Sequence, residues 1–198
     1  MLYQYGIINA TNVFMSMIQT ESPYFQGSAN TQAPLPFDQV VAFTGYLSWN
    51  DCSSSTRSCN NAWALLVDTS SNIFINGTGF YSWFQNYDEA CVNTANCQQK
   101  MIYTYNSANL WLDHVIAIGA VEMVTPAVGN IVNNIVMATS NLQGNIYPWW
   151  SVVAKYLDST AAINTNTIPA PVKVGWVAFG DSYAAGIGTG CKYLVSLL

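Results

Sequence analysis

The chain has 198 residues, enough for one ordinary domain with a sizeable core. Only 8% of the residues are charged, whereas 51% are hydrophobic and 14% aromatic, which suits a rigid, β-rich secreted protein or a piece of a larger core. Five Lys and Arg residues against ten Asp and Glu leave no basic patch for phosphates, so nucleic acid and anionic membranes are not expected as partners.

Targeting signals are the first feature in chain order. Residues 1–19 have no basic start and no small-residue cleavage site, so they do not form a signal peptide. The longest apolar stretch, 110–125, is interrupted by Asp113, His114 and Glu122 and falls short of the about 20 apolar residues that a spanning helix needs. We therefore expect no transmembrane segment.

The body of the chain nevertheless has the marks of a secreted protein. Two close cysteine pairs are placed for local disulfides in an oxidising compartment, although four reduced thiols are the alternative: Cys52 with Cys59, and Cys91 with Cys97. Sequons at Asn9 and Asn76 predict glycosylation. A secreted body without a signal suggests that an N-terminal part of a longer protein is missing.

Three segments share one form, in which an apolar strand and a short polar turn ending in Asn precede a second apolar strand. Asn12, Asn72 and Asn109 take the equivalent place in the segments "YGIINATNVFMSMIQ", "AWALLVDTSSNIFINGTGF" and "KMIYTYNSANLWLDHVIAIG". β-branched and aromatic residues dominate these segments, which favours strands.

Repeated strand–turn–strand units predict an all-β fold, a right-handed parallel β-helix fragment in which each coil stacks on the next. Asn suits the turn because it tolerates left-handed backbone geometry and its amide can hydrogen-bond to the Asn of the next coil. A β-sandwich of short strands is the competing interpretation. The unequal spacing of the units predicts inserted loops at 21–60 and 84–99.

The remaining segments are less regular. Residues 147–157, "YPWWSVVAKYL", predict a short capping helix after Pro148. Residues 158–171 are rich in Thr, Asn, Ala and Pro and read as an extended linker. Residues 172–198 open with a buried-type strand and predict a short, unfinished α/β segment.

The runs "YQYGIINATNVFMSMIQTESPYFQ", "SWNDCSSSTRSCNNAWALLV" and "GFYSWFQNYDEACVNTANCQQKMI" carry a resemblance to a family. They resemble consecutive parts of the C-terminal half of fungal β-1,3-glucanases of glycoside hydrolase family 55, over residues 2 to about 157. The resemblance implies two tandem parallel β-helices with the active cleft between them. Residues 1–157 would then be the C-terminal coils of the second, with the N-terminal β-helix missing.

For chemistry, the resemblance implies a carboxylic acid that protonates the leaving glucosyl oxygen while water attacks with inversion. Glu21 is the candidate for this acid. It follows an apolar strand and is flanked by Pro23, Tyr24 and Phe25, and an apolar setting favours the neutral form of a carboxylic acid. The alternative is a solvated Glu at a strand end.

Side chains near Glu21 and after the second repeat are candidates for binding the glucan. Aromatic rings can stack on sugar faces and Gln side chains can hydrogen-bond to hydroxyl groups, although each residue alone could equally serve packing. The candidates are Tyr24, Phe25, Gln26, Tyr81, Trp83, Phe84 and Gln85.

The stretch "FGDSYAAGIGTG" resembles the first block of GDSL esterases, the SGNH hydrolases, with Ser182 in the place of the nucleophile. The resemblance covers about 20 residues, and a glycine-rich tail is the alternative. The later Asp and His of that family do not follow. Asp113 and His114 do not replace them, because neighbours on a strand point to opposite faces.

We therefore expect a fragment of a secreted fungal glycoside hydrolase acting on β-1,3-glucan, inactive alone because half of the cleft is missing. The alternatives are a carboxylester hydrolase using Ser182 and a non-catalytic β-helical module that binds carbohydrate. No cofactor and no metal site is expected.

Overall fold

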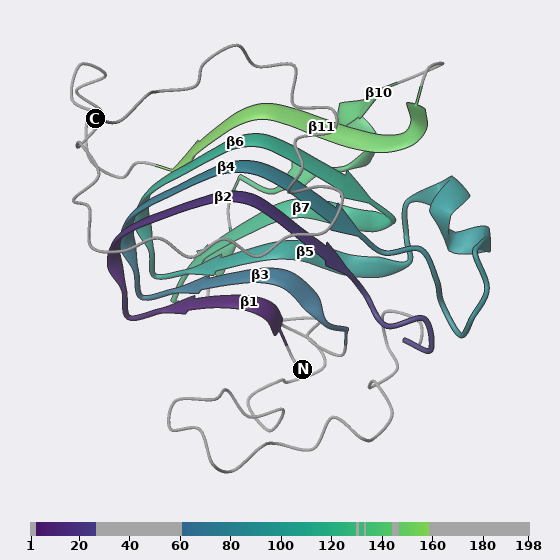
Figure 1. The fold of residues 1–198 in the computed structure, drawn as a ribbon, viewed down its shortest axis with the longest axis horizontal. Coiled ribbons are helices and arrows are strands. Elements are labelled where there is room, and N and C mark those ends of the chain that lie inside the picture. The colour runs from purple at the N-terminus through teal and green to yellow at the C-terminus, as the bar shows by residue number, and fades with distance from the viewer. Residues whose placement is uncertain (1–2, 27–60, 130, 133, 144–146, 159–198) are drawn as a thin grey trace.

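The computed structural model of the chain describes residues 3–26, 61–129, 131–132, 134–143 and 147–158. These residues form strands and two short 3-10 helices, η2 (Ala90–Thr94) and η3 (Thr139–Asn141), but no α-helix. The expected all-β class is confirmed (Figure 1). Within these ranges, no helix is long and apolar enough to cross a membrane.

One sheet collects the first strand of each repeat. Its parallel part has the order β1 (Tyr3–Ile8), β3 (Trp63–Asp68), β5 (Gln98–Tyr105) and β7 (Ala120–Val128). Two short strands pair with β7 in the antiparallel direction, β8 (Ile131–Val132) and β9 (Val136–Met137).

The other sheet collects the second strand of each repeat. Its parallel part has the order β2 (Thr11–Glu21), β4 (Ser71–Tyr81) and β6 (Ala108–Ile118). Two antiparallel strands continue it beyond β6, β11 (Tyr147–Asp158) and then β10 (Leu142–Gln143).

Successive repeats stack strand on strand in the same register. Phe14 lies opposite Phe74, and Phe74 lies opposite Trp111. The connection between β2 and β3 is longer than that between β4 and β5, which explains the unequal spacing of the repeats, as expected. Both sheets are mixed and neither closes, so the parallel β-helix stays a prediction.

The turn asparagines stack as the sequence predicts. Asn12, Asn72 and Asn109 have φ angles of 59°, 56° and 55°, in the left-handed region that Asn tolerates. The Asn72 Nδ2 donates to the Asn12 Oδ1 at 3.0 Å, and the Asn109 Nδ2 donates to the Asn72 Oδ1 at 3.1 Å. The amides therefore form a ladder that holds the three turns in register.

A second row of left-handed residues crosses the middle of β2, β4 and β6. Met17, Gly77 and His114 have φ angles of 56°, 76° and 54° and occupy equivalent positions, because Ser16, Asn76 and Asp113 pair just before them. The left-handed residues interrupt the regular alternation of side chains. No such row was expected from the sequence.

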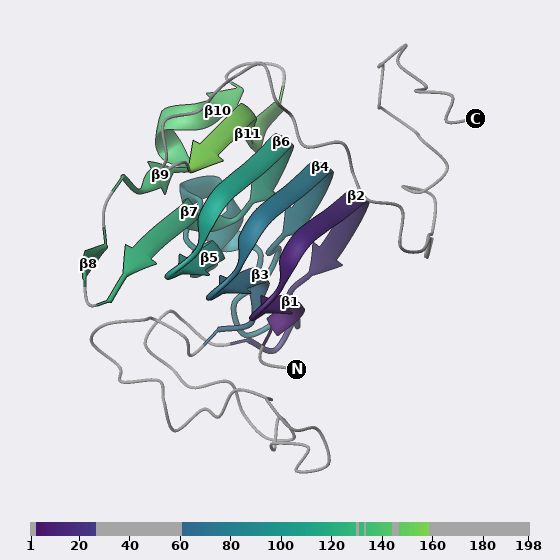
Figure 2. The ribbon, with the colours of Figure 1, turned by 90° about the vertical axis from the view of Figure 1, so that its left-hand side faces the viewer.

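The core lies between the two sheets, which face each other in the view along the strands (Figure 2). The large aliphatic side chains that fill it are buried completely: Leu65, Ile73, Ile75, Ile102, Leu110 and Leu112. In β4 and β6 they alternate with exposed or half-buried residues, as expected for strands with one buried face. In β3 and β5 nearly every residue is buried, because a second cluster of Trp63, Leu66, Tyr103 and Ala127 is buried as well.

The prediction of a capping helix at 147–157 is wrong. These residues belong to β11, which pairs with β6 from Trp150 opposite Ile118 to Asp158 opposite Leu110. Without β11, the long edge of β6 would leave a row of backbone groups unpaired. The β-branched and aromatic residues of this segment also favour a strand, and Pro148 stands at its start, where a proline is tolerated.

Candidate functional site

Glu21 and the candidates for binding the glucan gather at one end of the second sheet. The carboxyl ends of β2, β4 and β6 meet there, with Glu21 opposite Tyr81 and Tyr81 opposite Ile118. The antiparallel β11 begins at the same end. Loops 22–26 and 82–97 leave the sheet here, so they bring residues that are distant in the sequence together.

Glu21 is the last residue of β2, and its side chain is exposed. Tyr24 is 46% exposed, and its hydroxyl donates to the Glu21 Oε2 at 3.4 Å. The Gln4 Nε2 donates to the backbone oxygen of Glu21 at 2.6 Å and so anchors the strand end. Glu21 is therefore accessible to a ligand and oriented from one side by a tyrosine, although it lacks the enclosed apolar setting expected from its neighbours.

Ser22, Ser82 and Gly119 follow directly after the ends of β2, β4 and β6 and pack closely against one another. The buried Ser22 Oγ donates to the Ser82 Oγ at 2.8 Å, and the Ser82 backbone N–H donates to the Ile118 oxygen at 2.9 Å. Gly119 follows with a φ of 75°, and a Cβ at this position would lie 1.9 Å from the Ser82 backbone oxygen. Only glycine fits there, so the base of the site has little freedom to shift.

Gln26 and Gln85 have their amides bonded within the chain. Gln26 is fully buried, where its Oε1 accepts from the Ala62 N–H at 2.7 Å and its Nε2 donates to the Gln98 Oε1 at 3.2 Å. The Gln85 Nε2 donates to the backbone oxygens of Asn96 and Cys97 at 2.7 and 3.0 Å. These contacts hold the loops together.

The aromatic candidates divide into exposed and buried members. The rings of Tyr24 and Phe84 are in contact, with centroids 4.3 Å apart. Tyr81 is buried and packs against the half-buried Trp83, with centroids 5.8 Å apart. Phe25 is half-buried. Tyr24, Trp83 and Phe84 therefore keep surface that a ligand can reach.

Tyr87 is an exposed aromatic residue that the sequence reasoning missed. It lies in the tight turn between Gln85 and Asp88, which exchange backbone hydrogen bonds at 2.9 Å. Its φ is 65°, unusual for a bulky residue, and it is 70% exposed. The Tyr87 N–H donates to the Tyr24 oxygen, so the turn is fastened to the loop after Glu21. An Asn followed by an aromatic residue in a polar loop was the only available signal.

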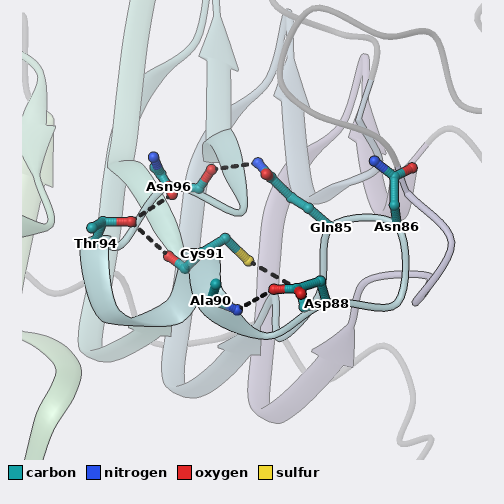
Figure 3. A pocket seen from close by; sticks show the side chains of 7 residues that line it. All are labelled: Gln85, Asn86, Asp88, Ala90, Cys91, Thr94 and Asn96. Atoms are coloured by element: carbon teal, nitrogen blue, oxygen red, sulfur yellow. Dashed lines mark hydrogen bonds between the residues drawn. The ribbon is translucent and has the colours of Figure 1, made fainter.

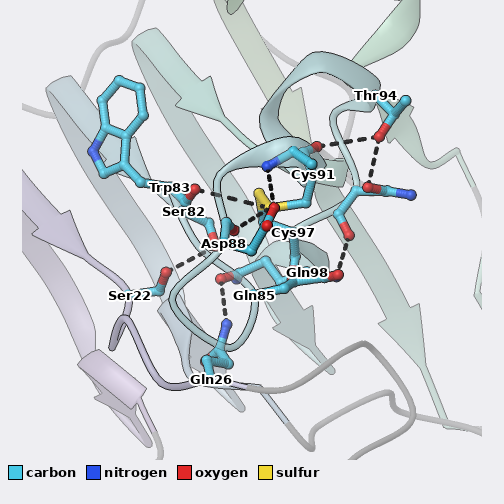
Figure 4. The surroundings of a disulfide bond; sticks show 12 residues. Ser22, Gln26, Ser82, Trp83, Gln85, Asp88, Cys91, Thr94, Cys97 and Gln98 are labelled. Carbon is cyan, nitrogen blue, oxygen red and sulfur yellow. Dashed lines mark hydrogen bonds between the residues drawn. A yellow bond between two sulfur atoms is a disulfide. The ribbon is translucent and has the colours of Figure 1, made fainter.

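The predicted disulfide between Cys91 and Cys97 is present (Figure 4). It closes the part of loop 82–97 that contains η2, and both cysteines pack with Tyr81, Val92 and Ile118. Figure 4 shows the Trp83 ring directed away from the disulfide. Cys52, Cys59 and Ser182 lie outside the described residues.

A polar hollow of about 430 Å³ opens in the same loop, lined by Gln85, Asn86, Asp88, Ala90, Cys91, Thr94 and Asn96 (Figure 3). Its polar groups are largely bonded to each other. The Asp88 Oδ1 accepts from the Ala90 N–H at 2.7 Å, and the Thr94 Oγ1 bonds to the Cys91 oxygen and the Asn96 Oδ1. This hollow offers a ligand few groups that lack a partner.

A smaller hollow of about 260 Å³ lies beside it, between loop 82–97 and the start of β11. It is lined by Trp83, Glu89, Ala90, Val92, Asn93 and Trp149. Among these, the sequence pointed to Trp83 alone as a residue that binds the glucan. Trp149 lies in residues 147–157, for which the sequence predicts a helix, so its position beside loop 82–97 was not expected.

The other titratable residues contribute little at this end of the sheet. Asp113 faces the Lys155 ammonium at 3.8 Å, and His114 is exposed. Burial raises the pKa of Asp158. Burial, and to a smaller extent the charge of Asp158, raises the pKa of Tyr156. Both residues pair with the opposite end of β6, away from Glu21. In the described ranges, no group of three His, Cys, Asp or Glu residues could hold a metal ion.

No protein-family model matches the chain. It is 42% identical over 101 residues to a "Probable glucan endo-1,3-beta-glucosidase" of Arthroderma benhamiae, covering 51% of this chain and 11% of the relative. It is 33% identical over 132 residues to a "Glucan 1,3-beta-glucosidase" of Cochliobolus carbonum, an alignment that covers 64% of this chain and 16% of the relative. It is also 32% identical over 168 residues to the "Non-secreted LysM effector LysM15" of Penicillium expansum, an alignment that covers 85% of this chain and 10% of the relative.

The chain therefore spans between 10% and 16% of the length of these relatives. The alignments support a relationship with β-1,3-glucanase-like glycoside hydrolases. Membership of family 55 and the GDSL segment stay predictions.

Proposed function

We propose that the chain is part of a secreted β-1,3-glucan hydrolase, and that its described strands are coils of a right-handed parallel β-helix of the family 55 kind. The relatives named as glucan 1,3-beta-glucosidases support the substrate. The parallel register and the ladder of Asn12, Asn72 and Asn109 support the coils. The disulfide between Cys91 and Cys97 supports an oxidising compartment.

Glu21 is the general acid in this proposal. The observation that carries it is the exposed carboxylate at the carboxyl end of β2, with the Tyr24 hydroxyl 3.4 Å from its Oε2 and the Tyr24 ring in contact with Phe84. A general acid must reach the leaving oxygen of the substrate, and a carboxyl group at an open strand end can do so. The Tyr24 hydroxyl positions the carboxyl group for that contact.

Inversion needs a second carboxylate that activates water, about 6.5–9.5 Å from the acid. We propose that this group comes from outside the described residues. The isolated chain then binds glucan but releases little glucose. Glucan is the proposed partner, and glycans at the exposed Asn9 and Asn76 are proposed modifications.

Hydrolysis by purified chain tests the role of Glu21. We expect the low rate of glucose release from laminarin to fall about 100-fold or more in Glu21→Gln, because the amide cannot protonate the leaving oxygen. Release from 2,4-dinitrophenyl β-laminaribioside should change much less, because that leaving group needs no proton. Asp68→Asn is the matched control, because Asp68 is the last residue of β3 and lies beside the asparagine turns, at the end of the molecule opposite Glu21.

Equal loss on both substrates would contradict acid catalysis by Glu21. Rapid release by the wild-type chain that Glu21→Gln abolishes would instead contradict the proposed inactivity and keep the role of Glu21. A folded chain that binds no laminarihexaose would rule out the glucan altogether. The esterase alternative rests on Ser182, outside the described residues, and hydrolysis of p-nitrophenyl acetate that is lost in Ser182→Ala would favour it.

A further inference from the structure

The hollow lined by Trp83, Glu89, Ala90, Val92, Asn93 and Trp149 has the features of a binding site. Two indole rings reach it from different parts of the chain, Trp83 from just after β4 and Trp149 from β11. The buried Val92 lines it, and the exposed Glu89 and Asn93 add a carboxylate and an amide. Apolar walls with a few polar groups are the usual composition of a small-molecule site.

Local structure holds these groups in place. The disulfide between Cys91 and Cys97 fixes η2, and the Val92 N–H donates to the Glu89 backbone oxygen at 3.0 Å. The Trp149 Nε1–H donates to the Asn93 Oδ1 at 3.0 Å and joins the loop to β11. The indole has no other polar group, so Trp149, which is 45% exposed, offers its ring to a ligand.

The chemistry of the lining selects a neutral, hydroxylated ring. An indole presents a large, rigid, apolar surface, which suits the C–H face of a pyranose. The Glu89 carboxylate accepts hydrogen bonds from hydroxyl groups, and the Asn93 Nδ2 can donate them while its Oδ1 holds Trp149. Glu89 repels anionic ligands, and a bare cation offers no acceptor to the Asn93 amide. The volume of 260 Å³ lies below the about 300–1,000 Å³ of drug-sized pockets and suits one ring.

The Trp149 side of the hollow is separate from Glu21 across the sheet, whereas Trp83 follows β4, the neighbour of β2. The strand order is β2, β4, β6 and β11, with Glu21 ending β2 and Trp149 near the start of β11. Three strand spacings of about 4.8 Å place the two strand ends roughly 14 Å apart. A ligand that occupies both places must therefore be a chain of several sugars.

We propose that Trp149, Trp83, Glu89 and Asn93 form a subsite for one neutral pyranose unit of a glucan chain, away from the bond that is cut. The choice of glucan as the source of this unit rests on the proposed function. The subsite contributes to binding and takes no part in the chemical step. Affinity should therefore rise from laminaribiose to laminarihexaose, because only the longer chain spans the sheet end.

Calorimetric titration of the full 198-residue chain with laminarihexaose tests the subsite. Trp149→Ala should weaken binding about tenfold, because the stacking surface is lost. Trp149→Phe should weaken it less, because a ring remains. Trp111→Ala is the matched control, since Trp111 lies in the middle of the sheet, opposite Phe74 and Leu157. Circular dichroism shows whether each variant keeps the fold.

The outcomes separate the subsite from the proposed function. Equal affinity of Trp149→Ala and wild type, or an equal loss in Trp111→Ala, would overturn the subsite while leaving hydrolysis through Glu21 untouched. Binding that Trp149→Ala weakens, in a chain whose hydrolysis does not depend on Glu21, would keep the subsite and reject the acid. Binding of tetramethylammonium in place of laminarihexaose, with the same dependence on Trp149, would show a cation cage and overturn the proposal.

Discussion

At the scale of single residues, the turn asparagines combine two properties that suit the stacked turns. Each tolerates a left-handed φ, and each amide can both donate to and accept from a neighbouring amide. Asn72 stands in the middle of the ladder, so it donates to Asn12 and accepts from Asn109. Its replacement tests both properties at once.

We expect Asn72→Ala to lower the free energy of unfolding by about 2 kcal/mol, because two hydrogen bonds are lost and alanine resists the left-handed region. Asn72→Gly is the matched variant, since glycine adopts that region freely and removes only the amide. It should cost about half as much. Urea denaturation measures both values, and equal losses in the two variants would show that backbone strain plays no part.

The residue scale also limits what sequence patterns can reveal about the site. The exposure of Glu21 and of Tyr24 agrees with a place at an open strand end. Nothing in the local sequence shows that Gln26 is buried, because its partner Gln98 lies 72 residues away. The same holds for Trp149, whose partner Asn93 lies 56 residues away.

At the scale of elements, loop 82–97 is the most constrained connection of the described chain. The disulfide, η2 and the Gln85 amide all tie it to itself, and Trp149 ties it to β11. Both hollows at this end of the sheet are built from it. A rigid loop keeps the groups of a binding surface in place before the ligand arrives, which lowers the entropic cost of binding.

Removal of this disulfide should lower both the stability of the fold and the affinity for glucan. We expect Cys91→Ala with Cys97→Ala to lower the free energy of unfolding by about 2 kcal/mol, because the bond closes only a short loop. Affinity for laminarihexaose should fall as well, because η2 no longer holds Glu89 and Asn93. Urea denaturation and calorimetry measure the two effects. Unchanged affinity in the folded double variant would show that the loop keeps its shape without the bond.

At the scale of the whole molecule, β1 and β2 stand at the outer ends of their sheets. Within the described chain, their outer edges have no strand partner, and Phe14 is 49% exposed beside the ring of Phe74. Open edges of this kind pair readily with another chain. The stacking of parallel strands that stabilises the fold therefore also leaves an edge for self-association.

We expect the chain to self-associate with increasing concentration, and Phe14→Glu to reduce this by placing a charge on the open edge. Leu157→Glu is the matched control, because Leu157 lies in the same cross-strand row but on β11, away from that edge. Sedimentation velocity over a range of concentrations measures the association. An equal reduction by both variants would indicate contact through the sheet face.

Much of the architecture could be predicted because it depends on short-range pattern. The strand–turn–strand repeats, the left-handed asparagines and the Cys91–Cys97 bond each involve residues close in sequence or identical in each repeat. The strand at 147–158 was missed because Pro148 at its start also fits the first turn of a helix, and β6, the pairing partner that decides between the two, is distant in the sequence. The left-handed row at Met17, Gly77 and His114 was missed because only Gly77 marks it.

The all-β class, the stacked turns and a carboxylate at the end of a strand could be inferred from the amino-acid sequence alone. Those features follow from local conformational preference and from repetition. The three-dimensional fold was needed to show which side chains at the sheet end are bonded within the chain, as with Gln26 and Gln85, and which remain open to a ligand, as with Glu21 and Trp149. The reason is that burial and hydrogen bonding depend on the register between strands, which brings together residues tens of positions apart.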